Sequence, residues 1–355
     1  MGVPLVYTLR DGNLYGTERM ALATAAGLAA EGFDPTLIAP PGPALARAAA
    51  AGWTTLAFEG WAGFAAALTQ VLSAHRRLAF LATDVKHSLA FAAANLAFRR
   101  RAAHVHPVHG GQPTDEIAYG RKRFAAKAGA VLVAVSDFVR RRLLDFGAPA
   151  GSVRVVENFL PPERIADAPK RPAFAEPGVR RIAVVSRLEW NKRLDVLLDA
   201  LAGRADVAAR LSVRVLGGGA MCDGLRRRAA ALPGRVEFVG FTDRVAEELA
   251  SADLLVHTCP DEPFGLAVLE AMAADLPVLV PDAGGAGSLV TEGVSGFRYR
   301  AGDPGALADR LAELSSAPAD RLNAVVGGAR AGLADRFDAR RRIADYRDLL
   351  LERLG

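Results

Sequence analysis

The sequence predicts an α/β protein built from two Rossmann-like domains with parallel sheets. Its 355 residues are enough for two domains that each bury a core of their own. Residues 251–297 contain a buried strand (DLLVH), a Pro/Gly loop, an apolar helix and a second buried strand (PVLVP). Residues 3–40 contain the same series of strand, glycine loop, helix and strand. Strand, helix and parallel strand in succession form the unit from which parallel sheets are built, so both halves indicate this fold class.

Composition and charge argue against a membrane-spanning, a disulfide-rich and a zinc-binding protein. Apolar residues make up 51% of the chain, and 44 basic against 39 acidic side chains give a net charge of +5. No apolar run is long enough to predict a membrane span, and the start of the chain lacks the features of a signal peptide. Cys222 and Cys259 are far apart and predict neither a disulfide framework nor a zinc site. We therefore expect a cytoplasmic protein.

A ligand site is predicted in the loop between DLLVH and the following helix. Ligands of parallel sheets bind beyond the carboxyl ends of the strands. Glu262 lies in this loop and Glu270 follows after seven intervening residues, while Gly265 lets the backbone approach a ligand closely. The free N–H groups at the helix start, near Leu266 and Ala267, favour an anion such as phosphate. After the second strand, VSGF (294–297) predicts a hairpin-like turn.

The run EPFGLAVLEAMAADLPVLVPDAGG resembles the Glu-x7-Glu signature of retaining GT-B glycosyltransferases, in particular family 4, also named glycosyl transferases group 1. The alternative is that the two glutamates only solvate a loop and a helix face; the Pro-Phe-Gly before the helix and the Gly-Gly turn after it favour the family. The resemblance implies two facing domains with a cleft, the acceptor bound by the first and the nucleotide sugar by the second. It implies that Glu262 acts at the donor sugar, that Glu270 binds the ribose, and that Phe264, Gly265 and Leu266 contact the donor.

A second segment, SRLEWNKRLDVLLDAL, resembles the family's Gly-Arg-Leu…Lys-Gly segment, which implies that Arg187 and Lys192 bind the donor diphosphate. A departing diphosphate needs fixed cations, and no metal motif is present to supply them. Two surface cations at a helix start would be the alternative, but the helix dipole disfavours positive charge there. Ser186 and Arg193 stand where the family has glycine or another small residue, and Asp275 stands where it has glycine.

The first half carries two further matches. GTERMALATAAGLAAEG resembles the family's Gly-Gly-x-Glu-Arg segment, which implies that Gly16 faces the diphosphate, although Tyr15 replaces the first glycine. VHPVHGG resembles the family's strand ending in His-Gly, which implies that His109 reaches the donor sugar near the reacting carbon. The alternative for His109 is a strand-end histidine bonded to backbone. His104 and His106 have no carboxylate or cysteine nearby in sequence, so we interpret them as core or edge residues rather than metal ligands.

Domain boundaries follow from composition and from the family. We expect an acceptor-binding domain over 1–160, a nucleotide-sugar domain over 161–335, and a final helix over 336–355 that packs back on the first domain. Five prolines in 160–181 mark the connection between the domains. Basic residues gather at Arg99–Arg101, Arg121–Arg123, Lys127 and Arg140–Arg142. We interpret them as solvated surface in preference to a peripheral membrane contact. Nucleic-acid binding is not predicted, because no aromatic residues lie between these basic residues to stack on bases.

The predicted activity is transfer of a hexose, with retention of configuration, from a nucleotide-diphosphate sugar to a hydroxyl of a small-molecule, lipid-linked or glycan acceptor. Family frequency favours UDP, and we expect neither a cofactor nor a metal. His109 and Glu262 are the candidate catalytic residues. Two alternatives remain: a GT-B nucleotide-sugar epimerase, which would need grouped acid/base carboxylates, and a non-catalytic subunit that binds the nucleotide sugar.

Overall fold

The computed structural model describes residues 2–110 and 116–355. The chain forms two compact units, each of which is described separately below. The first unit contains the residues up to Phe159 together with Ala339–Gly355, and the second contains Leu160–Asp338. Each unit is built on a parallel sheet, so the predicted α/β class with two Rossmann-like domains is confirmed. No helix in the described part of the chain is long and apolar enough to cross a membrane.

The first unit has a seven-stranded sheet in the order β3-β2-β1-β4-β5-β6-β7. All neighbouring strands are parallel. The chain first builds outward on one side of β1 and then crosses to β4 on the other side, so the order reverses between β1 and β4. The strands are β1 (Val3–Thr8), β2 (Phe33–Ala39), β3 (Thr54–Ala57), β4 (Arg77–Ala82), β5 (Arg101–Val108), β6 (Val131–Ala134) and β7 (Val153–Val155).

The helices of the first unit connect successive strands, except for the last, which comes from the end of the chain. They are α1 (Gly16–Ala30), α2 (Pro43–Ala50), α3 (Gly60–Ala74), α4 (Val85–Phe98), α5 (Lys122–Lys127), α6 (Asp137–Asp145) and α16 (Ala339–Leu354), with short turns at Glu116–Gly120 (π) and Ala150–Ser152 (3₁₀). His104 and His106 are buried in this core, His104 edge-on to the rings of Phe80 and Phe91.

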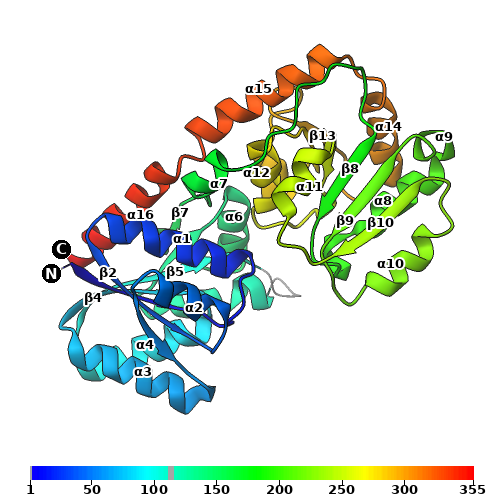
Figure 1. Ribbon diagram of the computed structural model, residues 1–355. Coiled ribbons are helices and arrows are strands. Elements are labelled where there is room, and N and C mark those ends of the chain that lie inside the picture. Colours follow the sequence, from blue (N-terminus) through cyan, green and yellow to red (C-terminus); the bar gives the residue numbers. More distant parts are fainter. Residues whose placement is uncertain (1, 111–115) are drawn as a thin grey trace. The chain divides into compact units, whose positions relative to one another are not determined.

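Helix α16 packs against α1 and β5, so the end of the chain completes the core of the first unit (Figure 1). Ile343, Tyr346 and Leu350 are buried on its inner face. A side chain at Gly27 of α1 would stand only 2.5 Å from Ile343 Cδ1, so this glycine allows the two helices to approach closely. Removing α16 would expose this apolar surface to water.

The second unit has a six-stranded sheet in the order β10-β9-β8-β11-β12-β13, with parallel neighbours throughout. The order reverses between β8 and β11. The strands are β8 (Arg181–Val185), β9 (Ser212–Leu216), β10 (Arg235–Gly240), β11 (Leu254–Val256), β12 (Val278–Pro281) and β13 (Phe297–Tyr299). The turn expected at 294–297 is present at 293–295, where an isolated bridge joins Glu292 and Gly296. It does not join two antiparallel strands, because Phe297 begins a strand that runs parallel to β12.

The helices of the second unit surround an apolar core that includes Val184, Leu197, Val215, Leu254 and Leu279. They are α7 (Pro162–Ala166), α8 (Leu194–Gly203), α9 (Ala205–Ala208), α10 (Cys222–Ala229), α11 (Val245–Ser251), α12 (Leu266–Ala273), α13 (Gly284–Leu289), α14 (Pro304–Leu314) and α15 (Ala319–Asp335), with a 3₁₀ turn at Trp190–Lys192.

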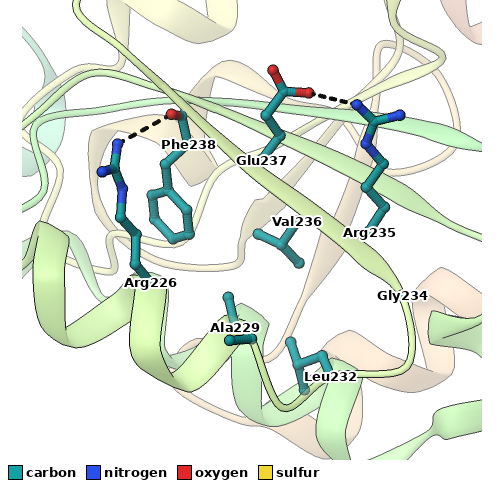
Figure 2. Close-up of a pocket in the computed structure, with 9 residues that line it drawn as sticks. Arg226, Ala229, Leu232, Gly234, Arg235, Val236, Glu237 and Phe238 are labelled. Carbon is teal, nitrogen blue, oxygen red and sulfur yellow. Dashed lines mark hydrogen bonds and ion pairs between the residues drawn. The ribbon is translucent and has the colours of Figure 1, made fainter.

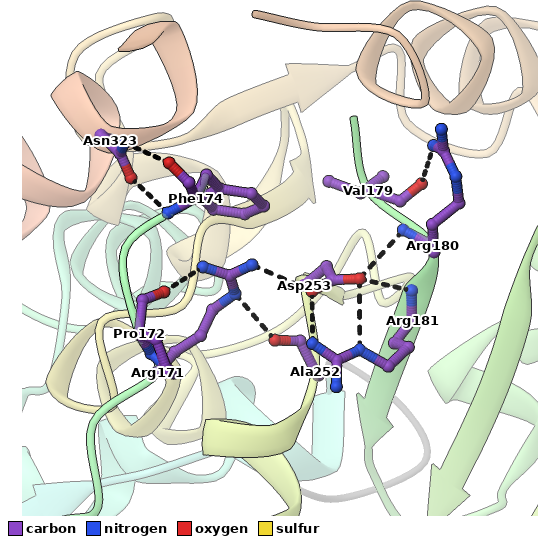
Figure 3. A network of polar contacts seen from close by, with 9 residues as sticks. All are labelled: Arg171, Pro172, Phe174, Val179, Arg180, Arg181, Ala252, Asp253 and Asn323. Carbon is purple, nitrogen blue, oxygen red and sulfur yellow. Dashed lines mark hydrogen bonds and ion pairs between the residues drawn. The ribbon is translucent and has the colours of Figure 1, made fainter. Parts of the chain in front are cut away.

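A buried carboxylate fastens the proline-rich segment before β8 to the sheet. Asp253 is 6% exposed and precedes β11. Its oxygens accept hydrogen bonds from the guanidinium groups of Arg171 and Arg181 and from the backbone N–H groups of Arg180 and Arg181 (Figure 3). Arg171 also donates to the carbonyl of Ala252. Both carboxylate oxygens thus accept hydrogen bonds, as a buried charge requires.

Candidate active site

The predicted donor residues of the second unit lie at the point where its strand order reverses. β8 and β11 are neighbours in the sheet, so the loops that follow them meet at the carboxyl edge. The β8 loop carries Arg187 and Lys192, and the β11 loop carries Glu262. This position is where open parallel sheets bind their ligands, because the two loops diverge and leave a crevice.

Lys192 and Glu262 form an ion pair although they are far apart in sequence. Lys192 Nζ lies 2.7 Å from Glu262 Oε2, and both side chains are largely buried, with 14% and 16% exposed. His257, at the end of β11, brings its Nε2 to 3.5 Å from the same oxygen. The three groups form a compact cluster of one ammonium, one carboxylate and one imidazole.

The electrostatics of this cluster favour the charged forms of Lys192 and Glu262. Burial alone would raise the pKa of Glu262, but the Lys192 ammonium and His257 outweigh it and hold that pKa well below its usual range. Burial opposes the charge on Lys192 too, and Glu262 overcomes this, so the pKa of Lys192 is raised. Each group therefore keeps the other ionised at neutral pH, and the site holds a fixed cation.

Two further bonds fix the β8 loop to the β11 loop. The hydroxyl of Thr258 donates to the carbonyl of Lys192 at 2.7 Å, and the Cys259 thiol donates to the carbonyl of Asn191 at 3.2 Å. Both acceptors are backbone groups beside the Lys192 side chain. The ammonium is thus positioned by the fold rather than by its flexible stem alone.

His257, Cys259 and Glu262 place three potential metal-ligand atoms within 4.8 Å of one another. Two observations argue against a resident ion there. The Lys192 ammonium already occupies the Glu262 oxygen that a cation would need. Burial also raises the pKa of Cys259 to about 12, so this residue is a thiol rather than a thiolate ligand. The chemistry of the group fits an ammonium site better than a metal site.

Glycines allow the β11 loop to pack tightly on the turn that follows β12. Gly265 has a φ of 106°, a conformation that favours glycine, and it caps α12. The Gly285 N–H donates to the carbonyl of Glu262, and a Cβ at Gly285 would stand only 2.2 Å from the carbonyl oxygen of Pro263. The Gly-Gly turn therefore supports the loop that carries Glu262.

The other residues of this unit that are predicted to bind the sugar donor lie outside the Lys192–Glu262–His257 cluster. Arg187 is half exposed and pairs with Glu189 at 2.8 Å, and Glu270 on α12 pairs with Arg164 at 2.9 Å. Leu266 is the first residue of α12, whose first N–H groups form no bond within the helix. Phe264 is 2% exposed and lies edge-on to Phe337, so its ring belongs to the core and only its backbone can contact a ligand.

The two predicted residues of the first unit lie at the carboxyl edge of its own sheet. Gly16 is the first residue of α1, and His109 directly follows β5. Burial lowers the pKa of His109 to about 4, and its Nε2 has no hydrogen-bond partner among the described residues. The ring is therefore neutral at pH 7 and can donate a hydrogen bond to a ligand. Gly111, the second glycine of VHPVHGG, lies outside the described residues.

A hollow of about 610 Å³ in the second unit is separate from these residues. It lies between α10 and the edge strand β10 (Figure 2). Arg226 reaches the carbonyl of Phe238 there, and Arg235 pairs with Glu237. None of the predicted site residues lines this hollow, so it contributes nothing to the candidate site.

Two features of the site were missed in the sequence. His257 is the polar last residue of the DLLVH run, and its place directly before the Glu262 loop was the available signal. Phe241 follows β10 at the carboxyl edge and is 74% exposed. Its ring lies over Gly218, where a Cβ would stand 2.7 Å from a ring carbon. An exposed aromatic ring fixed in this way offers a flat face to a ligand.

Comparison with protein families decides the assignment. The model of the family "Glycosyltransferase Family 4" matches residues 15–164, and that of "Glycosyl transferases group 1" matches residues 168–329. The chain belongs to the group 1/family 4 glycosyltransferases. The two matches together span both units, and the fold of this glycosyltransferase is GT-B.

Individual relatives agree with this assignment. The glycosyltransferase is 32% identical over 237 residues to a D-inositol 3-phosphate glycosyltransferase of Streptomyces avermitilis, covering 61% of this chain and 50% of the relative. It is 36% identical over 128 residues to a GDP-mannose-dependent phosphatidylinositol dimannoside mannosyltransferase of Mycobacterium tuberculosis, covering 35% and 32%. It thus spans half or less of these relatives.

Among solved structures, Anabaena HepE in complex with UDP and glucose superposes with a TM-score of 0.80 at 20% identity. The superposition covers 98% of both chains, and it shows that the fold of the glycosyltransferase is shared over its whole length.

Proposed function

We propose that the protein transfers a hexose from a nucleotide-diphosphate sugar to an acceptor hydroxyl, with retention of anomeric configuration and without a metal. The observation that carries this proposal is the buried Lys192–Glu262 pair at the strand-order reversal of the second sheet. It supplies a fixed positive charge at the loop that leads into α12, and the free N–H groups at the start of this helix also favour an anion. A departing diphosphate is the ligand that this combination fits.

Each residue then has a role that its surroundings support. Lys192, together with Arg187 and the N–H groups near Leu266, stabilises the charge that develops on the leaving diphosphate. Glu262 holds the ammonium in place and presents its other oxygen to a sugar hydroxyl. Neutral His109 donates a hydrogen bond to the donor sugar, since its low pKa keeps it uncharged.

Retention without a covalent intermediate is the mechanism we favour. Glu262 carries the only carboxylate that we place at the reacting sugar, and its bond to Lys192 makes it a poor nucleophile. The acceptor hydroxyl then attacks from the side that the diphosphate leaves, and the departing phosphate oxygen takes its proton. NMR of the product tests this mechanism, and an inverted anomeric centre would disprove it.

UDP is the nucleotide we propose for the donor. The HepE structure holds UDP, whereas the mycobacterial relative is named for GDP-mannose. The face of Phe241 suits the stacking of a base, which does not by itself separate the two. A thermal-shift comparison does, because a nucleotide at a hundred times its dissociation constant stabilises the protein by about 2.7 kcal/mol. Turnover that disappears with EDTA would contradict the metal-free proposal.

Replacing Glu270 with glutamine is expected to weaken nucleotide binding about tenfold, because an amide has one acceptor oxygen where the carboxylate has two for the ribose diol. Titration of UDP by calorimetry measures this effect. Glu247→Gln on α11 is the matched control, since Glu247 is exposed and lies in another helix. Equal affinities for all three proteins would remove Glu270 from the donor site.

A further inference from the structure

Positive side chains without an ion-pair partner among the described residues gather at one edge of the sheet in the first unit. Its strand order reverses between β1 and β4, so the loops after these strands meet at the carboxyl edge as they do in the second sheet. The β1 loop carries Arg10, and the β4 loop leads into α4 through Asp84, Lys86 and His87. Asp84 caps α4 by accepting from the N–H of Lys86 at 2.7 Å.

Lys122 adds a largely buried basic side chain to this edge. The interpretation of Arg121–Arg123 as solvated surface is wrong for this residue, which is only 9% exposed. It begins α5, which packs on α4, and Asp84 and Arg10 are close enough to act on its charge. Among the described residues, its Nζ has no hydrogen bond or ion pair, and it is not one of the fully covered polar atoms without a partner. The ammonium therefore reaches the surface, where a ligand can contact it.

An aromatic wall stands beside these charges. His87 is 6% exposed, and its Nδ1 has no hydrogen-bond partner among the residues described. Its ring stacks on Phe64 at 4.1 Å between centroids, and Trp61 lies edge-on to it at 5.9 Å. Trp61 is 54% exposed. This edge of the sheet therefore combines polar donors with a flat apolar surface of the kind that sugar and cyclitol rings contact.

The charges at this edge do not balance. Asp84, Arg10 and Arg121 act on Lys122, and Asp84, Arg10 and Lys86 act on His87, so Asp84 is the one carboxylate among these described groups. Neither Arg10 nor Lys122 has an ion-pair partner in the part of the chain that the structure describes. A phosphate ester carries about −1.5 to −2 charges at neutral pH and has three acceptor oxygens. A phosphate group therefore fits both the excess positive charge and the number of hydrogen-bond donors that have no partner among the described residues.

We propose that the carboxyl edge at β1 and β4 binds a phosphate group of the acceptor, held by Lys122 and Arg10, with Trp61 against the acceptor ring. This inference rests on the proposed transferase function and names the class of its acceptor. The phosphate belongs either to a soluble phosphate ester or to a lipid headgroup, and both present the same group to the two cations.

Binding experiments with the full chain test the proposal. Calorimetry compares myo-inositol 3-phosphate with myo-inositol, and sedimentation compares phosphatidylcholine vesicles with and without phosphatidylinositol. We expect the phosphate-bearing member of at least one pair to bind about tenfold or more tightly. Preference in the soluble pair identifies a soluble ester, and preference in the vesicle pair alone identifies a lipid. No preference in either pair would overturn the proposal.

Variants then locate the phosphate. Lys122→Met is expected to abolish the preference, and Arg10→Gln is expected to reduce it. Lys127→Met in the same helix and Arg47→Gln in α2 are the matched controls, because both side chains are exposed. Affinity for UDP should be unchanged in all four variants, and their far-UV circular dichroism and Tm should match those of the wild type, which shows that both units are folded. If Lys122→Met still prefers the phosphate-bearing ligand, Lys122 does not bind the phosphate and the proposal is refuted. If the wild type does not bind UDP, the proposed donor site is refuted instead.

The pH dependence gives an independent test. Burial lowers the pKa of Lys122 to about 8. Its ammonium is therefore present below pH 8 and lost above it, so phosphate affinity should fall as the pH rises from about 7 to about 9.5. Lys122→Arg should keep its affinity over this range, because a guanidinium stays charged; an equal decline in both proteins would contradict the role of Lys122. The charged and titratable groups that act on Lys122, or on which it acts, are Arg10, Asp84, His106 and Arg121.

Discussion

Lys192→Met is expected to lower the rate of sugar transfer by a factor of roughly 10² to 10³. Methionine keeps the length of the side chain but removes the charge that would stabilise the leaving diphosphate. No other cation of the described second unit is both buried and paired with Glu262, so exposed Arg187 cannot replace it. Release of UDP from the donor, measured with and without acceptor, gives the rate.

The same substitution leaves Glu262 buried beside His257 without its counter-ion, which costs stability as well. The double variant Lys192→Met/Glu262→Gln separates the two effects, because it removes both charges. We expect the double variant to regain thermal stability but not turnover. Recovered turnover would mean that Lys192 serves only to neutralise Glu262. Arg204→Met is the control, since Arg204 is an exposed cation beyond the opposite end of α8.

Asp253→Asn is expected to destabilise the second unit by roughly 3 kcal/mol or more. An amide cannot accept from two guanidinium groups and two backbone N–H groups at once. Arg171, whose side chain is 9% exposed, would be left as a buried cation without its counter-ion. Scanning calorimetry measures the loss as a lower Tm. Asp206→Asn breaks an exposed pair with Arg204 and should leave Tm unchanged.

The contribution of Asp253 also depends on pH. Burial would raise its pKa, but the hydrogen bonds from Arg181 and Arg171 lower it below the ordinary value. The folded state therefore binds the proton more weakly than the unfolded state. The stabilisation is complete at neutral pH and disappears as the pH falls below about 4. The stability difference between wild type and Asp253→Asn should shrink in acid, and a constant difference would rule out this linkage.

Sequence patterns were sufficient for the architecture because buried parallel strands are continuous apolar runs bounded by glycine and proline. They placed Lys192 and Glu262 on loops of one edge, but they could not reveal the direct contact between the two side chains, which depends on β8 and β11 being neighbours. Strand β3 was not predicted, since TTLA is short and only partly buried. This strand forms by pairing within the sheet rather than because its own residues strongly favour a strand.

The departures from the family pattern have a physical explanation that sequence alone did not give. Arg193 and Asp275 have φ values of 53° and 59°, in the left-handed region that glycine adopts most easily. Both replace a small residue or glycine of the family. Asp275 pairs with Arg330 at 2.7 Å, and Arg193 pairs with Asp195 at 3.2 Å. Each of these two left-handed residues therefore also forms an ion pair.

The position of α16 determines the order in which the chain can fold during synthesis. The second unit is one continuous segment, so its core can form as soon as Asp338 has left the ribosome. The first unit is made earlier but lacks the apolar face of α16 until that helix has been synthesised. Synthesis of the first unit therefore begins before that of the second unit and is completed after it.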